Sequence, residues 1–218
     1  MKIRIALGLS LAFMALGAAA ADNAPERIVQ GSTVTSARDP AVRITVPKAA
    51  QYVGAARWDL NDIADAEIQV FVEADAQKRI QRLYWIQFEA YLPSNTHKFN
   101  YKFIEKLTHG GLEFDVRPRF GPTNEPPKPG SDLEHVQALL TERGFISPAE
   151  MMNVRLVNMA DDTNRKELMI IYAEDLAPSG ATFPELAAES GKARWDELKP
   201  ELIKRALENI KIERAPGS

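Results

Sequence analysis

A row of aromatic and polar residues between Arg82 and Leu92 has the residue types that a binding site needs. In a β-strand, alternate residues point to opposite faces of the sheet, so the segment has two faces. One face is apolar and predicts a buried core; it contains Tyr84, Ile86, Phe88, Ala90 and Leu92. The other face places a glutamine and a glutamate between aromatic rings; it contains Trp85, Gln87, Glu89 and Tyr91.

The mixed face has three interpretations. In a sheet with helices on one side only, it is the half-wet side, where large amphipathic residues reach water with their polar tips. Alternatively, Trp85 and Tyr91, together with Trp58, line a groove in which Gln87 and Glu89 orient a ligand. Ligand pockets of this kind are mostly apolar with a few placed polar groups. A protein interface is the third interpretation.

Motifs for catalysis or metal binding are missing from the sequence. It contains no Gly-x-Ser-x-Gly nucleophile turn, no His-Glu-x-x-His and no glycine loop for phosphate. The three histidines, His97, His109 and His135, fall in different predicted elements without a ligand spacing. We therefore predict no catalytic residue, no metal ligand and no cofactor, and we favour a protein that is not an enzyme.

The N-terminal segment predicts export. Basic residues at the start of residues 1–21 precede an apolar run, Ile5 to Gly17, and the small residues Ala18 to Ala21 close the segment. This order is typical of a secretory signal peptide. A membrane anchor needs about 20 apolar residues, and the run is shorter than that unless the alanines are included. We expect a soluble, periplasmic or secreted mature protein with no membrane span.

The composition argues against a nucleic-acid partner and excludes disulfide bonds. The 27 basic and 30 acidic residues give a net charge of −3, and without the two basic residues of 1–21 the balance is 25 − 30 = −5. Nucleic-acid binding needs a basic surface, so we predict no nucleic-acid partner. The absence of cysteine excludes disulfides and thiolate chemistry.

The apolar spacing predicts strands followed by a helix, two strands and a final helix. Alternation indicates strands near residues 42–46, 52–60, 67–73, 82–92, 101–107, 112–116, 151–159 and 166–174. A capping box of Ser131 and Glu134 predicts the start of the first helix. The last helix has an apolar face that contains Trp195, Leu198, Leu202, Ala206 and Ile210.

This order predicts an α+β fold. We expect an antiparallel meander of about eight strands, packed by the mid-chain helix and the long C-terminal amphipathic helix. Residues 22–40 are expected to be a flexible lead-in, residues 41–213 a single domain, and the proline-rich residues 121–130 a stiff connector or a flap over a site. The element order is similar to helix-over-sheet folds such as the START-like helix-grip fold and the PsbP-like sandwich, but no family motif is present.

Three functions of different classes are compatible with these features. The first is a non-enzymatic periplasmic binding or carrier module for a small amphipathic ligand. The second is an envelope structural or protein-interaction module, whose exposed aromatic residues or terminal helix contact an envelope protein. An acid–base enzyme is the third, and the missing motifs weigh against it only weakly, because acid–base sites often lack local signatures.

Export gives the first testable prediction. We expect the mature chain to begin between Ala20 and Asn23, because the small residues end there. N-terminal sequencing of protein recovered from the periplasm measures this directly. Membrane-bound protein that still carries Met1 would contradict it.

Overall fold

Strands dominate the computed structural model, which describes residues 24–102 and 105–215. The larger of two antiparallel sheets has seven strands in the order β4-β5-β6-β10-β9-β8-β7. These are β4 (Gln51–Leu60), β5 (Ala64–Ala74), β6 (Ile80–Tyr91), β7 (Glu105–His109), β8 (Leu112–Pro122), β9 (Glu150–Met159) and β10 (Lys166–Asp175). The smaller sheet has the order β1-β2-β3-β11, formed by Ile28–Gln30, Thr33–Ser36, Val42–Thr45 and Lys211–Arg214.

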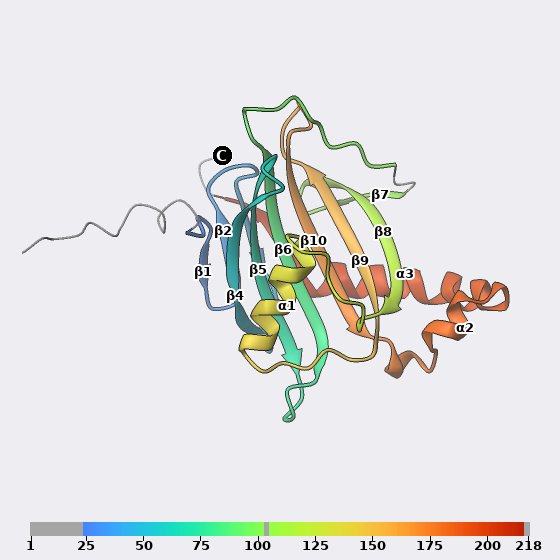
Figure 1. Ribbon diagram of the computed structural model, residues 1–218. Coiled ribbons are helices and arrows are strands. Elements are labelled where there is room, and N and C mark those ends of the chain that lie inside the picture. Colours follow the sequence, from blue (N-terminus) through green and yellow to red (C-terminus); the bar gives the residue numbers. More distant parts are fainter. Residues whose placement is uncertain (1–23, 103–104, 216–218) are drawn as a thin grey trace, which may run out of the picture.

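Helices and the small sheet cover the large sheet from opposite sides (Figure 1). The helix α1 (Asp132–Glu142) lies over one face, and α3 (Lys192–Asn209) crosses behind the other. The short helix α2 (Phe183–Ala187) and two 3-10 turns, Ala177–Ser179 and Glu189–Gly191, connect β10 to α3. None of the described helices has an apolar stretch long enough to cross a bilayer.

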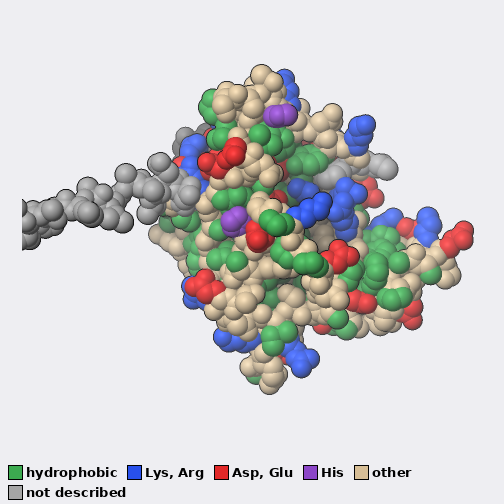
Figure 2. Space-filling view, in the orientation of Figure 1, with side chains coloured by type: hydrophobic (Ala, Val, Ile, Leu, Met, Phe, Trp, Pro, Cys, Tyr) green, Lys and Arg blue, Asp and Glu red, His purple; other side chains and the backbone are tan. Residues whose placement is uncertain are grey.

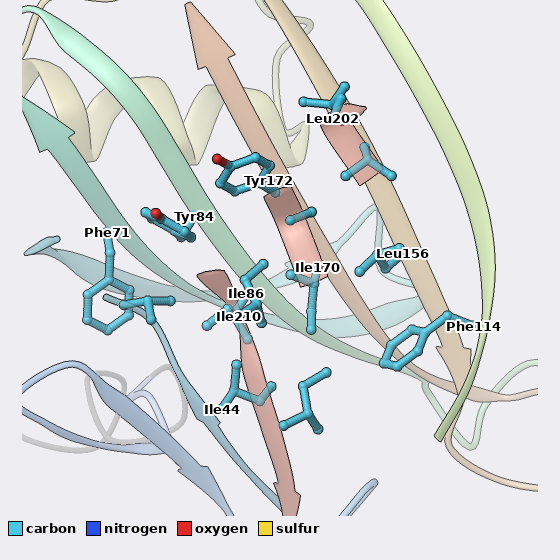
Figure 3. Packing of buried hydrophobic residues seen from close by; sticks show 14 of the residues in the cluster. Ile44, Phe71, Tyr84, Ile86, Phe114, Leu156, Ile170, Tyr172, Leu202 and Ile210 are labelled. Carbon is cyan, nitrogen blue, oxygen red and sulfur yellow. The ribbon is translucent and has the colours of Figure 1, made fainter. Parts of the chain in front are cut away.

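The face toward α3 and the small sheet holds the larger core (Figure 3). Tyr84 and Ile86 of β6 pack there with Ile170 of β10, Ile44 of β3 and Ile210 at the end of α3. The predicted apolar face of the last helix is confirmed, because Leu202, Ala206 and Ile210 are fully buried in this core. The same is true of Tyr84, Ile86 and Phe88 on the apolar face of β6.

The opposite face has a second core beneath α1. Val136 and Leu140 of α1 are buried against Trp85 of β6, with Val157 and Met169 from the neighbouring strands. The helix begins where the sequence predicts, since the Ser131 side chain accepts a hydrogen bond from the backbone N–H of Glu134. This helix places its first turn above the predicted aromatic and polar row.

The antiparallel α+β prediction is confirmed, but the single meander is wrong in detail. Strands β4, β5 and β6 follow one another, while β7 to β10 form a second run that returns to pair β10 with β6. The hairpin from β7 to β8 turns at Gly110 and Gly111, whose φ values of 57° and 78° suit a tight turn. Periodicity identifies such strands but does not determine which distant strand becomes a neighbour.

The predicted flexible lead-in needs correction. Residues 28–30 and 33–36 form β1 and β2, and Val34 is fully buried in the larger core. Glu67 of β5 also holds the preceding segment, since its carboxylate accepts hydrogen bonds from the backbone N–H groups of Glu26 and Arg27. These short strands have little periodicity of their own and are ordered by tertiary contacts.

The larger core gives a stability prediction. Phe88 is 2% exposed, and truncation of a buried phenylalanine typically costs about 3–5 kcal/mol of unfolding free energy. Phe88→Ala should show this loss in urea unfolding. Ile28→Ala is the control, because Ile28 is exposed and a surface change is usually within about 0.5 kcal/mol. Similar losses in both variants would mean that the assignment of the core face is wrong.

Candidate functional site

The first half of the aromatic and polar row of β6 is covered by protein rather than by water. Trp85 is 8% exposed and Gln87 is 0% exposed, so the half-wet interpretation is wrong for these two residues, whereas Glu89 and Tyr91 are half-buried. The row forms a chain of hydrogen bonds: Trp85 Nε1 donates to Gln87 Oε1 at 2.8 Å, and Gln87 Nε2 donates to Glu89 Oε2 at 3.1 Å. The chain connects the second core to a group of acidic residues.

The other two predicted site residues lie at the margins of this row. Trp58 of β4 is buried and stacks on His135 of α1, with ring centroids 4.0 Å apart. Tyr91, at the end of β6, stacks on Phe99 with centroids 4.4 Å apart, and His97 lies beside it. The row therefore does not converge on one ligand pocket as the groove interpretation expected.

Two glutamates face each other across β6 and β10. Glu89 and Glu167 are register partners, and like charges directly opposite each other destabilise a sheet. Burial, the Glu167 charge and the Asp132 charge raise the pKa of Glu89 to about 8. Burial raises the pKa of Glu167 to about 7, against the opposing influence of Tyr101 and Arg155. Both carboxyl groups therefore exchange protons near neutral pH.

Asp132 and Arg155 complete the polar surroundings of this pair. Burial raises the pKa of Asp132, the first residue of α1, and one of its carboxylate oxygens is buried without a hydrogen-bond partner. Arg155 of β9 lowers the pKa of all three acids, and its guanidinium lies 5.5 Å from the centre of the Tyr101 ring. We call Glu89, Glu167 and Asp132 the acidic group.

A groove of about 420 Å³ opens beside the acidic group, between α1 and strands β8, β9 and β10. Of the predicted site residues, Trp85 lines it, whereas Trp58, Gln87, Glu89 and Tyr91 do not. Most of its walls are apolar. Its apolar side chains are Leu83, Trp85, Phe120, Pro122, Leu133, Val136, Leu140, Met151, Ile171 and Ala173.

The proline-rich connector forms one wall of the groove. Gly121, Pro122, Thr123 and Glu125 line it as the chain leaves β8 for α1. The backbone N–H of Thr123 donates to the Ala149 carbonyl at 3.0 Å, which fixes this part of the segment beside the start of β9. The segment is thus a connector from β8 to α1 whose first residues form a wall of the groove.

Arginines lie on the β8–β9 side of the groove. Arg119 and Arg155 line it, and Arg117 is the register partner of Arg155. Figure 2 shows a group of Lys and Arg side chains on this face, close to apolar side chains. Burial and the neighbouring charges of Arg117 and Arg155 lower the pKa of Arg119. The groove therefore joins an apolar floor to a positive rim.

Other hollows of the described surface do not combine these properties. One of about 620 Å³ near α3 is lined by Arg82, Glu174 and Arg205. Its charges neutralise each other, because Arg205 Nη2 donates to the Glu174 carboxylate at 2.8 Å. A second, of about 610 Å³, lies at the loop around Tyr101 and Lys102.

Sequence reasoning missed Asp132, Glu167, Arg119 and Arg155. A signal was present for two of them, since Arg155 and Glu167 interrupt otherwise apolar faces of buried strands. Their contact with the β6 row depends on the pairing of β10 with β6, which no local pattern indicates.

The histidines are apart from one another in the structure as in the sequence. His135 stacks on Trp58, His97 lies near Tyr91, and His109 Nε2 is 2.6 Å from the Ile210 carbonyl oxygen. Within residues 24–102 and 105–215, no three acidic or histidine side chains are arranged to hold a metal ion. The predicted signal peptide lies outside the described residues.

Comparison of the chain with models of protein families, with curated proteins and with solved structures found no match. The geometry of the groove and of the acidic group is therefore the basis for a function.

The raised pKa of Glu89 gives a prediction for stability against pH. A carboxyl whose pKa rises from 4.5 to about 8 on folding favours the folded state when protonated. Its contribution is complete below the unfolded pKa and is lost as the pH rises toward 8. One pKa unit corresponds to about 1.4 kcal/mol, so the loss has an upper limit of about 5 kcal/mol.

Glu89→Gln should remove this contribution. Between pH 5 and pH 8, urea unfolding should show a smaller fall in unfolding free energy for Glu89→Gln than for the original chain. The control is Glu142→Gln, an exposed residue at the end of α1, which should keep the original pH dependence. An identical pH dependence in the original chain and Glu89→Gln would refute the raised pKa.

Proposed function

We propose that the chain is a non-enzymatic binding or carrier module for a small amphipathic ligand, and that it works in the periplasm after export. The groove between α1 and strands β8–β10 is the observation that carries the proposal. Its volume of about 420 Å³ is in the usual range for a small-molecule site, and such sites are mostly apolar with a few polar groups. The signal-peptide pattern supports the location.

The walls of the groove suit an apolar chain. Leu133 of α1 is 43% exposed and lines the groove, so its apolar side chain is available to a ligand. Val136 and Leu140 continue the same wall, and Trp85 and Ile171 contribute from the sheet. A ligand that covers these side chains would remove apolar surface from water, which is the main favourable term in binding.

A binding role fits the site better than acid–base catalysis does. Glu89 and Glu167 have pKa values near neutrality, as a general acid or base requires. Neither residue lines the groove, however, and α1 and its connection cover the face on which they lie. A substrate held in the groove would contact Arg155 and Trp85 before it contacted either carboxyl group.

A protein-interaction module is the second candidate. Leu133, near the start of α1, and Ile146, just after its end, are both exposed, at 43% and 54%. Two exposed aliphatic side chains, one on α1 and one in the loop after it, can anchor a partner, since a few buried anchors dominate interface energetics. The two candidates differ in whether the occupant is a small molecule or a protein.

Tryptophan fluorescence tests the proposed function. A ligand in the groove should change the emission of Trp85, so an extract of periplasmic small molecules should give a saturable change that Trp85→Phe removes. Trp58→Phe is the matched control, because Trp58 is also a buried tryptophan beside α1 but does not line the groove, so this variant should keep the response.

The wall of the groove provides a second measurement. Leu133→Ser should weaken binding about threefold to tenfold, because part of the apolar contact is lost. Ile28→Ser changes a similarly exposed residue on β1 and should have no effect. The proposal fails if the folded chain gives no saturable response, or if the response persists in both Trp85→Phe and Leu133→Ser. Native mass spectrometry of the purified periplasmic protein shows whether the occupant is a small molecule or a protein.

A further inference from the structure

The charge on the rim of the groove indicates the chemistry of the ligand. Arg117 of β8 and Arg155 of β9 are register partners, and Arg119 lies two residues further along the same face of β8. Of the three, Arg119 and Arg155 line the groove, whose other walls are mostly apolar. Two like charges beside an apolar surface are costly without an anion.

The two arginines that line the groove form no close ion pair with another described residue. In the described part of the chain, the ion pairs include neither Arg119 nor Arg155. The Nε of Arg155 is buried and has no hydrogen-bond partner. Among the residues that line the groove, Glu125 is the single acid, and it lies on the connector. A buried donor without a partner costs free energy that a ligand acceptor would recover.

The two arginines differ in what surrounds them. Arg155 also faces the acidic group and lowers the pKa of Glu89, Glu167 and Asp132, so part of its charge is balanced. Arg119 has positive neighbours on β8 and β9, and no carboxylate raises its pKa. A substitution of Arg119 therefore tests anion binding more directly than one of Arg155, because it does not also disturb the acidic group.

We propose that the groove binds a single-chain amphiphile with an anionic head group, either a carboxylate or a phosphate monoester. The head group contacts the guanidinium groups of Arg119 and Arg155, which offer planar donors suited to both anions. The apolar chain lies against Leu133, Val136 and Trp85. This inference rests on the proposed function, because it names the ligand class of the same groove.

The position of the acidic group favours this orientation. Glu89 and Glu167 lie on β6 and β10, while the arginines lie on β8 and β9, so the same sheet face is negative at one place and positive at another. A cationic head group would be expected at the acidic group, but that group does not line the groove. The head group that the groove itself can contact is negative.

Four amphiphiles with the same dodecyl chain provide the test: dodecanoate, dodecyl phosphate, dodecanol and dodecyltrimethylammonium. Isothermal titration calorimetry measures each affinity for the full mature chain, below the micelle concentrations of the three ionic amphiphiles and below the solubility limit of dodecanol. We expect at least one of the two anions to bind about tenfold more tightly than dodecanol, the gain typical of one charge-assisted hydrogen bond, and the cation to bind most weakly. Comparison of the two anions identifies the preferred head group.

Variants connect this preference to the rim. Arg119→Gln should weaken binding of the preferred anion about tenfold and leave dodecanol binding unchanged, and Arg119→Lys should restore part of the loss. Arg43→Gln is the matched control, because Arg43 is also an exposed strand arginine but lies on β3 of the small sheet. Circular dichroism shows that each variant is folded.

The outcomes distinguish failure of the anionic-head-group inference from failure of the proposed binding function. If dodecanol or the cation binds as tightly as both anions, or if Arg119→Gln leaves anion binding unchanged, the anionic head group is overturned while the binding function stands. If none of the four amphiphiles binds to folded protein, the inference is overturned, and the response to the periplasmic extract decides separately on the proposed function.

Discussion

Burial of both faces of the seven-stranded sheet is the constraint on which the rest of the structure depends. Its central strands carry large apolar residues in both directions: on β6, Ile86 points to one core and Trp85 to the other. A sheet of this kind must be covered on both sides, because exposed apolar surface on either face would be unfavourable. The α3 helix and the small sheet cover one face, and α1 covers the other.

The cover on the α1 face is incomplete, and this produces the groove. With 11 residues, α1 spans about 16 Å, whereas the 12 residues of β6 extend about 40 Å. The helix packs on β4 and β5, so the part of the face formed by β8, β9 and β10 is reached only by its edge and by the connector. An apolar floor with one open side is the consequence, and Leu133 remains exposed beside it.

Like charges lie opposite each other at two places on this face. Glu89 and Glu167 oppose each other across β6 and β10, and Arg117 and Arg155 oppose each other across β8 and β9. Pairing of opposite charges would have been more favourable for stability alone. Protonation near neutral pH reduces the repulsion between the two glutamates, because burial raises the pKa of both. For Arg119 and Arg155, which line the groove, we propose that an anion from outside the chain does so. Proteins commonly give up some stability at functional sites, and this face fits that pattern.

The sequence by itself determined the long strands, the two main helices and the polarity of their faces. Alternation along β6 separated Phe88 from Glu89, the Ser131 cap located the start of α1, and the glycine pair located the β7–β8 turn. These features depend on residues that are close in the chain, where backbone geometry alone fixes the relation between them. Trp85 was also found in this way, as an aromatic residue on a mixed face.

The tertiary structure alone decided what those faces contact. The pairing of β10 with β6 placed Glu167 opposite Glu89, and the pairing of β9 with β8 placed Arg155 beside Arg117. Residues 28–36 became strands only because the small sheet packs on the larger core. Such contacts join residues that are far apart in the sequence, and many pairings satisfy the same periodicity. The choice among them comes from the simultaneous burial of both sheet faces, which is a property of the whole chain.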